Sequence, residues 1–298
     1  MTARRAGVPL VHPGPPAAER IVSVATPVSV VRAELPAGSV VADALWELTR
    51  SAGCRGAHAE LSHGCFGRLR YVHPAIGADG APPATFSETV EPVAPGFVVG
   101  GSAAVGMREG RGFAHVHATW LDGEGRLRGG HLLPETTVGD VPIQVTLRAL
   151  PGVALVSDTD PETTMPVFTP HPVPCGDVPG PRAAVSRVRP GVDLHEAVAT
   201  VAAEAGFDSA VVRASLGSAV GAHLRRGSRL VEVPWPATEF ATLTGTVHGA
   251  GTARPRIVLA GSLVDLDGRV HTGVVVEGRN PVAVTFELYL EEADRAAG

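Results

Sequence analysis

Hydrophobic residues recur along the chain with two different spacings, and these spacings predict its main elements. In Val40–Ala52 and in Leu194–Ala205 the apolar residues return about every 3.6 positions, which is typical of a helix with one buried face. A glycine, Gly53 or Gly206, follows each of these segments at a position where helices commonly end. Much of the remaining chain alternates apolar and polar residues, which predicts strands.

The most informative alternating segment is Ala114–Leu133, with the sequence AHVHATWLDGEGRLRGGHLL. Two stretches rich in β-forming residues flank the turn sequence DGEG, so the segment predicts a β-hairpin. If the hairpin is centred on Glu124, His117 lies directly opposite His131. Residues two apart on a strand share a face, so His115 joins them.

Three imidazoles on one face of a hairpin favour a metal site. Opposed residues have Cβ atoms about 4.5–5.5 Å apart, and three neutral imidazoles with an open fourth position are the ligands of a catalytic zinc site. We therefore expect His115, His117 and His131 to bind a divalent metal ion, zinc in the first place. An alternative is that the histidines face solvent or are structural, with His131 in a tight bend at Gly129-Gly130.

The stretch GFAHVHATWLDGEGRLRGGHLL also resembles the signature of the plants-and-prokaryotes conserved (PPC) domain family. The resemblance rests on the GGHL strand after a hairpin and on the following run Thr136–Leu147, which ends in an apolar strand. It implies a compact α/β fold with a mixed, largely antiparallel sheet, a flanking helix and a trimeric assembly. Plant members carry AT-hook DNA-binding segments beside the domain. Many prokaryotic members lack these and resemble metal-binding proteins, with histidines that match the three named above.

An internal repeat organises the chain. The segment 44–53 aligns with 197–206 at an offset of 153 residues, and 121–135 aligns with 264–278 at an offset of 143. The difference of ten residues predicts an insertion in the first half, within Tyr71–Val90. The fold class expected is therefore α/β (α+β), with two tandem PPC-like domains.

The repeat and the proline content set the expected boundaries. Seven prolines fall in Ser157–Pro181, which excludes a regular helix or a central strand there and indicates an extended linker. The boundaries expected are a flexible leader at 1–27, the first domain at 28–156, the linker at 157–182, the second domain at 183–292 and a tail at 293–298.

The first 25 residues contain prolines and charges and no continuous apolar core, so we expect neither a signal peptide nor a membrane anchor. The cysteines are odd in number and show no CxxC spacing. They suggest free thiols and a reducing cytoplasm.

The repeat also predicts which half holds the metal. At the positions of the three histidines the second half has Val258, Ala260 and Val274. Structural histidines could also drift to apolar residues. The joint loss is nevertheless what the decay of a single metal site would produce, and we expect the second half to have lost the site.

Polar residues of the first half without counterparts in the second are candidates for further site residues. His58 and Glu60 alternate on a predicted strand, and the insertion region adds Arg70 and Glu88. A carboxylate such as Glu60 or Glu88 could be the general base on a metal-bound water. Arg70 would suit a carboxylate or carbonyl substrate. The alternative is that they are ordinary polar loop residues.

Charge limits the function classes. The formal net charge is −5, the pI is about 6.2, and there is no basic tail, so nucleic acid is an unlikely partner. We expect a metal-dependent enzyme, a hydrolase or lyase, that acts on a small polar, carboxylated molecule through a His₃-bound metal and water. The alternatives are a non-catalytic metal- or ligand-binding module and a DNA-associated regulator of PPC type.

Overall fold

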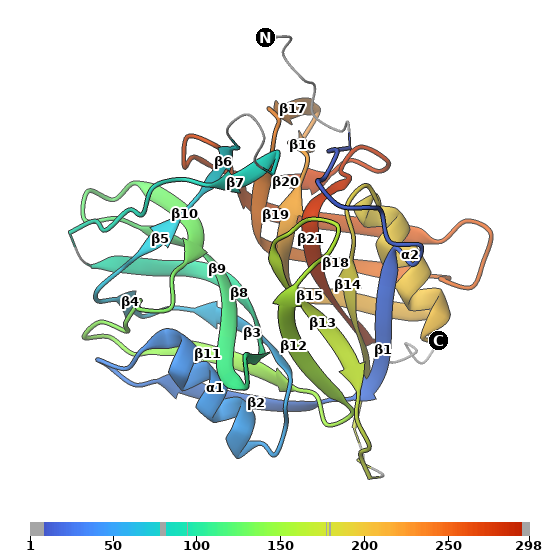
Figure 1. Cartoon of the computed structure of the whole chain (residues 1–298), viewed down its shortest axis with the longest axis horizontal. Helices are drawn as coiled ribbons and strands as arrows, with labels where there is room; N and C mark the ends of the chain where they lie inside the picture. Colours follow the sequence, from blue (N-terminus) through green and yellow to red (C-terminus); the bar gives the residue numbers. More distant parts are fainter. Residues whose placement is uncertain (1–8, 78–81, 94, 177, 179, 294–298) are drawn as a thin grey trace.

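The computed structural model describes residues 9–77, 82–93, 95–176, 178 and 180–293. In this part of the chain two large, mostly antiparallel sheets lie side by side, each with one helix on its outer side (Figure 1). No helix in the described ranges is both long and apolar enough to cross a membrane.

The first half and the connection to the second contain one helix and thirteen strands among the described residues. These are β1 (Ile21–Pro27), β2 (Ser29–Leu35), α1 (Val41–Ser51), β3 (Ala57–Ser62), β4 (Cys65–Phe66), β5 (Tyr71–Val72), β6 (Pro74–Ile76), β7 (Ala84–Phe86), β8 (Gly96–Arg108), β9 (Arg111–Leu121), β10 (Leu127–Leu132), β11 (Ile143–Ala149), β12 (Val153–Thr159) and β13 (Pro166–Pro172).

The second half contains the following described elements: β14 (Arg182–Val188), α2 (Leu194–Glu204), β15 (Ser209–Ala219), β16 (Ala222–Arg226), β17 (Arg229–Val233), β18 (Thr238–His248), β19 (Arg256–Val264), β20 (Val270–Val275) and β21 (Val282–Glu292).

The two halves share one strand order. The first sheet contains the path β2-β11-β3-β8-β9-β10-β5, and the second contains β14-β21-β15-β18-β19-β20-β16. Each strand of one path has its counterpart at the same place in the other, and α1 and α2 lie 153 residues apart at both ends. The structure therefore agrees with two tandem copies of one sheet-dominated α/β unit, as the sequence predicts.

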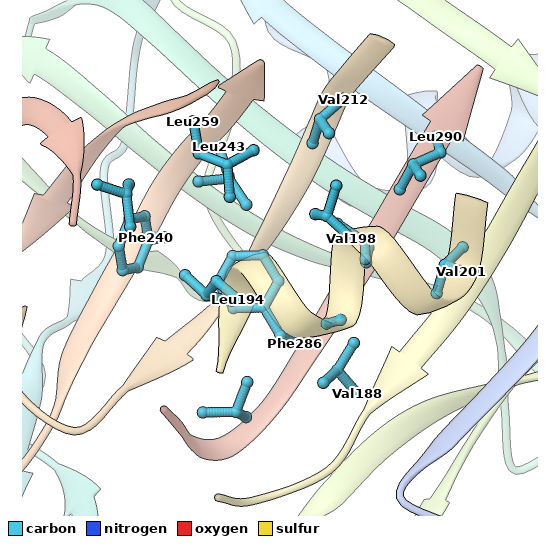
Figure 2. Close-up of a cluster of buried hydrophobic side chains, with 14 of the residues drawn as sticks. Val188, Leu194, Val198, Val201, Val212, Phe240, Leu243, Leu259, Phe286 and Leu290 are labelled. Atoms are coloured by element: carbon cyan, nitrogen blue, oxygen red, sulfur yellow. The ribbon is translucent and has the colours of Figure 1, made fainter. Parts of the chain in front are cut away.

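Each helix covers one face of its sheet, because its apolar residues recur about every 3.6 positions and so form one apolar side. In the second half Leu194, Val198 and Val201 of α2 point onto side chains of the sheet such as Phe286 and Leu243 (Figure 2). Asp193 caps α2, because its carboxylate accepts a hydrogen bond from the backbone N–H of His195. Gly53 and Gly206 end the two helices with φ of +72°, a left-handed conformation that suits glycine.

The strand register locates the predicted insertion. Val72 pairs with His131 and Arg225 pairs with Val274, so up to β5 and β16 the halves keep the offset of 153. From β8 onward they follow the shorter offset. The extra residues therefore lie between β5 and β8, where the first half forms the small β6–β7 hairpin. Residues 78–81 of the expected insertion lie outside the described residues.

The N-terminal segment differs from the flexible leader expected for residues 1–27. Residues 1–8 lie outside the described residues, but Ile21–Pro27 forms β1, which pairs with β14 at the edge of the second sheet. Arg20 forms an ion pair with Glu162 at 2.7 Å, and the side chain of Leu10 is buried. The alternation of Ile21–Ala25 carries this strand signal, and the prolines before it obscured it.

The proline-rich connection also differs from an extended linker. Pro166–Pro172 forms β13, which pairs antiparallel with β12. β13 has β12 as its only partner strand among the described elements, which is the edge position that prolines tolerate. The hairpin lies between the two halves, and Phe168 packs there with Leu155, Leu216 and Tyr289 in a core that both halves share (Figure 1). Of the expected tail, only Ala293 is described.

Candidate metal centre

The β9–β10 hairpin has the register that the sequence predicts. His131 pairs directly with His117, and Leu127 pairs with Leu121. The turn is closed by Asp122, whose carboxylate accepts hydrogen bonds from the backbone N–H groups of Glu124 and Arg126. The strands thus place the three histidines on one face, toward the second half of the chain.

The nitrogens of the three imidazoles converge. His115 Nε2 lies 2.9 Å from His117 Nε2, and His117 Nε2 lies 3.2 Å from His131 Nδ1. All three candidate ligand atoms lie within 4.8 Å of one another. A tetrahedral zinc ion bound at its usual Zn–N distance would separate such nitrogens by about 3.3 Å. Two of the three nitrogen separations are close to this value, and the three atoms are near enough together for small ring movements to bring them onto one ion.

The second half of the chain fixes two of these rings. His115 Nδ1 donates to the Glu287 carboxylate at 2.5 Å, and His117 Nδ1 donates to the carbonyl of Phe240 at 2.9 Å. Metal-binding histidines commonly use their second nitrogen in this way, toward a carboxylate or a backbone carbonyl. In the neutral tautomer that donates through Nδ1, Nε2 of each ring has a lone pair that can bind a cation.

The donor set fits a metal ion better than a proton. Two unprotonated Nε2 atoms at 2.9 Å direct their lone pairs at each other, which is unfavourable unless a cation lies between them. A proton can bridge only two of the three nitrogens, whereas a metal ion can bind all three. Burial first, and the neighbouring His115 second, hold the pKa values of His117 and His131 well below the ordinary range. Both rings are therefore neutral, as metal ligands must be.

The paired glycines before His131 have a packing role. Gly129 and Gly130 lie in β10 and not in a bend. A Cβ on Gly130 would lie 2.5 Å from the carbonyl oxygen of Val72 on the adjacent strand. A side chain here would therefore force β5 away from β10, and β5 is the strand that borders the cluster.

A cavity of about 240 Å³ opens from the histidines. Its walls come from the β6–β7 hairpin, from β13 and from β15, β18 and β21 of the second half. The Phe86 ring of the insertion lies against the His131 ring, with centroids 5.1 Å apart. The insertion thus forms part of the wall beside the three histidines.

The structure places the other candidate site residues away from this cavity. Glu60 forms an ion pair with Arg148 at 2.8 Å, and Arg70 forms ion pairs with Glu91 and Glu135. Glu88 is exposed. None of Glu60, Arg70 and Glu88 lines the described cavity.

His58, the partner of Glu60 on β3, has a packing role. Its ring is fully buried and stacks on Tyr289, and its Nδ1 lies 2.8 Å from the carbonyl of Ala214. Burial lowers the pKa of His58, so the ring is neutral. It fills the contact between the two halves.

The sequence reasoning missed the residues that the second half contributes. Glu287 is 3% exposed and Glu239 is 5% exposed, and both line the cavity. Glu287 alternates with Phe286 and Leu288, which face α2, so its strand parity points it toward the first half. This alternation could have identified Glu287 as a site residue, but only once it is known which face of β21 packs against the first half. Glu239 gives no comparable signal.

The equivalent place in the second half has become an open hollow. Ala260 pairs with Val274 as His117 pairs with His131. The hollow is lined by Arg225 and Arg226, by small residues and by four hydroxyl side chains, Thr242, Thr244, Ser262 and Thr272. No carboxylate lines it in the part of the chain that the structure describes.

One comparison with known proteins identifies a family. Residues 177–294 match the model of the Plants and Prokaryotes Conserved (PCC) domain, the family that the hairpin motif resembles. No curated protein matches the sequence.

Three similar solved structures come from Pyrococcus horikoshii, Ralstonia eutropha and Archaeoglobus fulgidus. The first is a plant- and prokaryote-conserved protein, 16% identical, covering 46% of this chain and 88% of its own, with a TM-score of 0.36. The second, a proposed DNA-binding protein, is 23% identical and covers 47% and 88%, with a TM-score of 0.37. The third, a metal-containing protein, is 18% identical and covers 47% and 92%, with a TM-score of 0.39.

These findings correct two expectations. The expected metal-dependent enzyme, and the expectation that nucleic acid is an unlikely partner, both conflict with a match to the PCC family and with relatives described as DNA-binding. The positions of Glu60, Arg70 and Glu88 also argue against the expected enzyme, because none of these three residues lines the cavity. Residues 177–294 are thus similar to the Plants and Prokaryotes Conserved (PCC) domain, whose model matches this part of the chain.

Proposed function

We propose that this protein is a DNA-associated regulator of the PCC type that carries a metal-binding centre in its first half. The DNA-associated part is supported by the family match and by the description of similar proteins as DNA-binding. Because the net charge is −5, contact with DNA must be local and not spread over the surface.

The hollow of the second half is the observation that carries this part of the proposal. Arg225 and Arg226 are exposed, and hydroxyl groups surround them without an acidic neighbour in the described lining. Arginine, serine and threonine side chains are common donors to DNA phosphates. This surface lies within the matched residues 177–294.

The DNA contact is tested by fluorescence anisotropy with a labelled duplex of mixed sequence over a range of salt concentrations. The double variant Arg225→Ala/Arg226→Ala should bind all sequences more weakly, and its salt slope should fall by about two. Arg279→Ala, an exposed arginine outside the hollow, is the control. Equal binding and equal slopes for wild type and the double variant would refute the assignment of the surface.

The metal part of the proposal rests on the three converging imidazoles and on their outer hydrogen bonds. We propose zinc as the ion, bound by His115, His117 and His131, because imidazole nitrogens suit zinc and the nitrogen spacing is close to tetrahedral. One similar structure is of a metal-containing protein. The ion would hold the hairpin against the second half through Glu287 and Phe240.

Elemental analysis of protein purified without chelator tests the centre. Wild type should contain about one metal ion per chain, and His117→Ala should contain none. His131→Ala is a second variant, because its ring makes no hydrogen bond outside the cluster among the described contacts and its removal should spare the fold. His248→Ala, an exposed histidine of the second half, should keep the metal. A metal-free wild type would end this part of the proposal and leave the DNA part standing.

Two further parts of the proposal follow from the family resemblance, which suggests a trimer, and from the cysteine pattern, which suggests a cytoplasmic location. We propose a homotrimer, which would hold six domains, and a cytoplasmic location. Light scattering should give three times the chain mass of 30.6 kDa. A mass of one chain over the micromolar range would refute the trimer.

A further inference from the structure

The cavity beside the metal centre contains more than the three histidines require. The cavity lies where the β6–β7 hairpin, β9, β13 and the second half of the chain meet. Two polar side chains on its wall have no role in holding the imidazoles. The inference drawn from them goes beyond the proposed function and shares with it only the histidine cluster.

Two buried polar atoms on the cavity wall lack a hydrogen-bond partner among the described residues. They are Glu239 Oε2 and Thr285 Oγ1. Glu239 is 5% exposed and Thr285 is 6% exposed, and both line the cavity. An unsatisfied buried polar group costs about 1–3 kcal/mol. A ligand inside the cavity that reached both side chains could supply the missing partners.

The rest of the wall is mainly apolar. Phe86, Phe113 and Phe168 line it, from the insertion, from β9 and from β13. Such walls favour an apolar ligand body, while a few polar groups fix its orientation. Cavities filled only by water are usually polar, with several partners for each water molecule.

The polar groups of the wall also indicate the head group of the ligand. Arg108 lines the cavity, with its guanidinium 5.5 Å from the centre of the Phe113 ring. A guanidinium favours an anionic oxygen, and the hydroxyl of Thr285 can donate to one. Burial raises the pKa of Glu239 to about 8, so its carboxyl is neutral at pH 7 and can donate as well.

We propose that this cavity binds a small monocarboxylic acid with an apolar body, held by Thr285, Glu239 and Arg108 between the two halves of the chain. The acid would contact both halves at once, so its binding would stabilise their contact. No chemical change of the acid is part of the proposal.

Calorimetric titration with benzoate and hexanoate tests the site, with benzyl alcohol and hexanol as matched neutral ligands. Metal-free and zinc-loaded protein are titrated separately and without DNA, so the result does not depend on the proposed function. We expect at least one acid to bind in one of these forms, and each alcohol to bind much more weakly than its acid. No binding of either acid to either form, or equal binding of acid and alcohol, would overturn the proposal.

Variants locate the binding. Thr285→Val keeps the shape of the side chain and should weaken binding of the acid about tenfold. Glu239→Leu should weaken it similarly, and Glu239→Gln, which keeps a donor, should stay close to wild type. Thr246→Val, an exposed threonine of the same half outside the cavity, is the control.

Two readouts keep a folding defect apart from a loss of binding. Without ligand, Thr285→Val should be at least as stable as wild type, because the variant removes an unsatisfied buried hydroxyl. Acid affinities that Thr285→Val and Glu239→Leu both leave unchanged would place the ligand elsewhere and refute the site.

Discussion

Glu287 connects the two halves through a single side chain. It lies on β21 of the second half, and its carboxylate accepts a hydrogen bond from His115 of the first half. Glu287→Gln should lower metal affinity about 10- to 100-fold, because the carboxylate holds the ring and makes it a stronger ligand. Competition with a chelator measures this. Glu292→Gln, on the same strand and away from the cluster, should match wild type, and an equal affinity for Glu287→Gln would show that the carboxylate does not support the centre.

Glu239 should make the stability of metal-free protein depend on pH. Burial raises its pKa in the folded protein to about 8 from an ordinary value of 4.5. Between these values the unfolded chain is ionised and the folded chain is not, so stability falls as pH rises toward 8. The charged or titratable groups that share its cavity are Arg108, Glu287 and the three histidines.

Denaturant midpoints measured from pH 7 to 8.5 test this effect, because the buried His117 and His131 are already neutral over that range. Glu239→Gln should remove part of the decline that wild type shows. Parallel curves for the two proteins would mean that Glu239 ionises as freely in the folded protein as in the unfolded one.

At this scale the sequence predicted the cluster of three histidines but not its surroundings. Strand parity and a centred turn are enough to bring His115, His117 and His131 together, because all three lie on one hairpin. Glu239, Thr285 and Glu287 lie more than a hundred residues away. Their approach depends on how the two sheets pack, which no local pattern encodes.

At the scale of elements, the β6–β7 hairpin is an addition to a unit that folds without it. The second half has the same strand order and passes from β16 to β18 through the β17 strand alone. Replacing Pro74–Phe86 with a short turn should therefore leave the circular dichroism spectrum nearly unchanged. Metal should leave faster, because the wall that contains Phe86 is lost.

Stopped-flow transfer of the metal to a chelator measures this rate. Shortening the exposed stretch 251–254 of the second half is a suitable control, because it lies away from the cavity. Equal release rates for wild type and the hairpin deletion would show that the insertion does not limit access to the ion.

The elements themselves follow well from the sequence where one period dominates. Both helices lie within one residue of the predicted bounds, since an apolar stripe and a terminal glycine mark each. β1 and β13 were missed because prolines surround or interrupt them. Their strands form through pairing with distant partners, and β13 accepts its prolines only because it has a free edge.

At the scale of the whole molecule, the repeat in the sequence predicted two similar units but not their contact. The part of the first sheet that contains the histidines is covered by the second half, while the hollow at the equivalent place of the second sheet is open. Two copies of one fold can therefore hold different ligands, because one surface is buried and the other is not.

The pairing of β1 with β14 has a consequence for how the protein is made. Ile21 pairs with Val188, so a ribosome must add 167 residues before the first strand can meet its partner. At usual elongation rates this takes about ten to thirty seconds. During that time the strand has an unpaired edge, which favours association with other chains.

The same pairing ties the beginning of the chain to its second half. A protease cut within the exposed stretch Pro174–Gly176 should therefore leave both fragments together in gel filtration, joined by β1. A chain that starts at Val28 and is cut at the same place should separate more readily. If the two behave alike, β1 contributes little to holding the fragments. The first strand can therefore join its sheet only after residues 182–188, well past the middle of the chain, have been made.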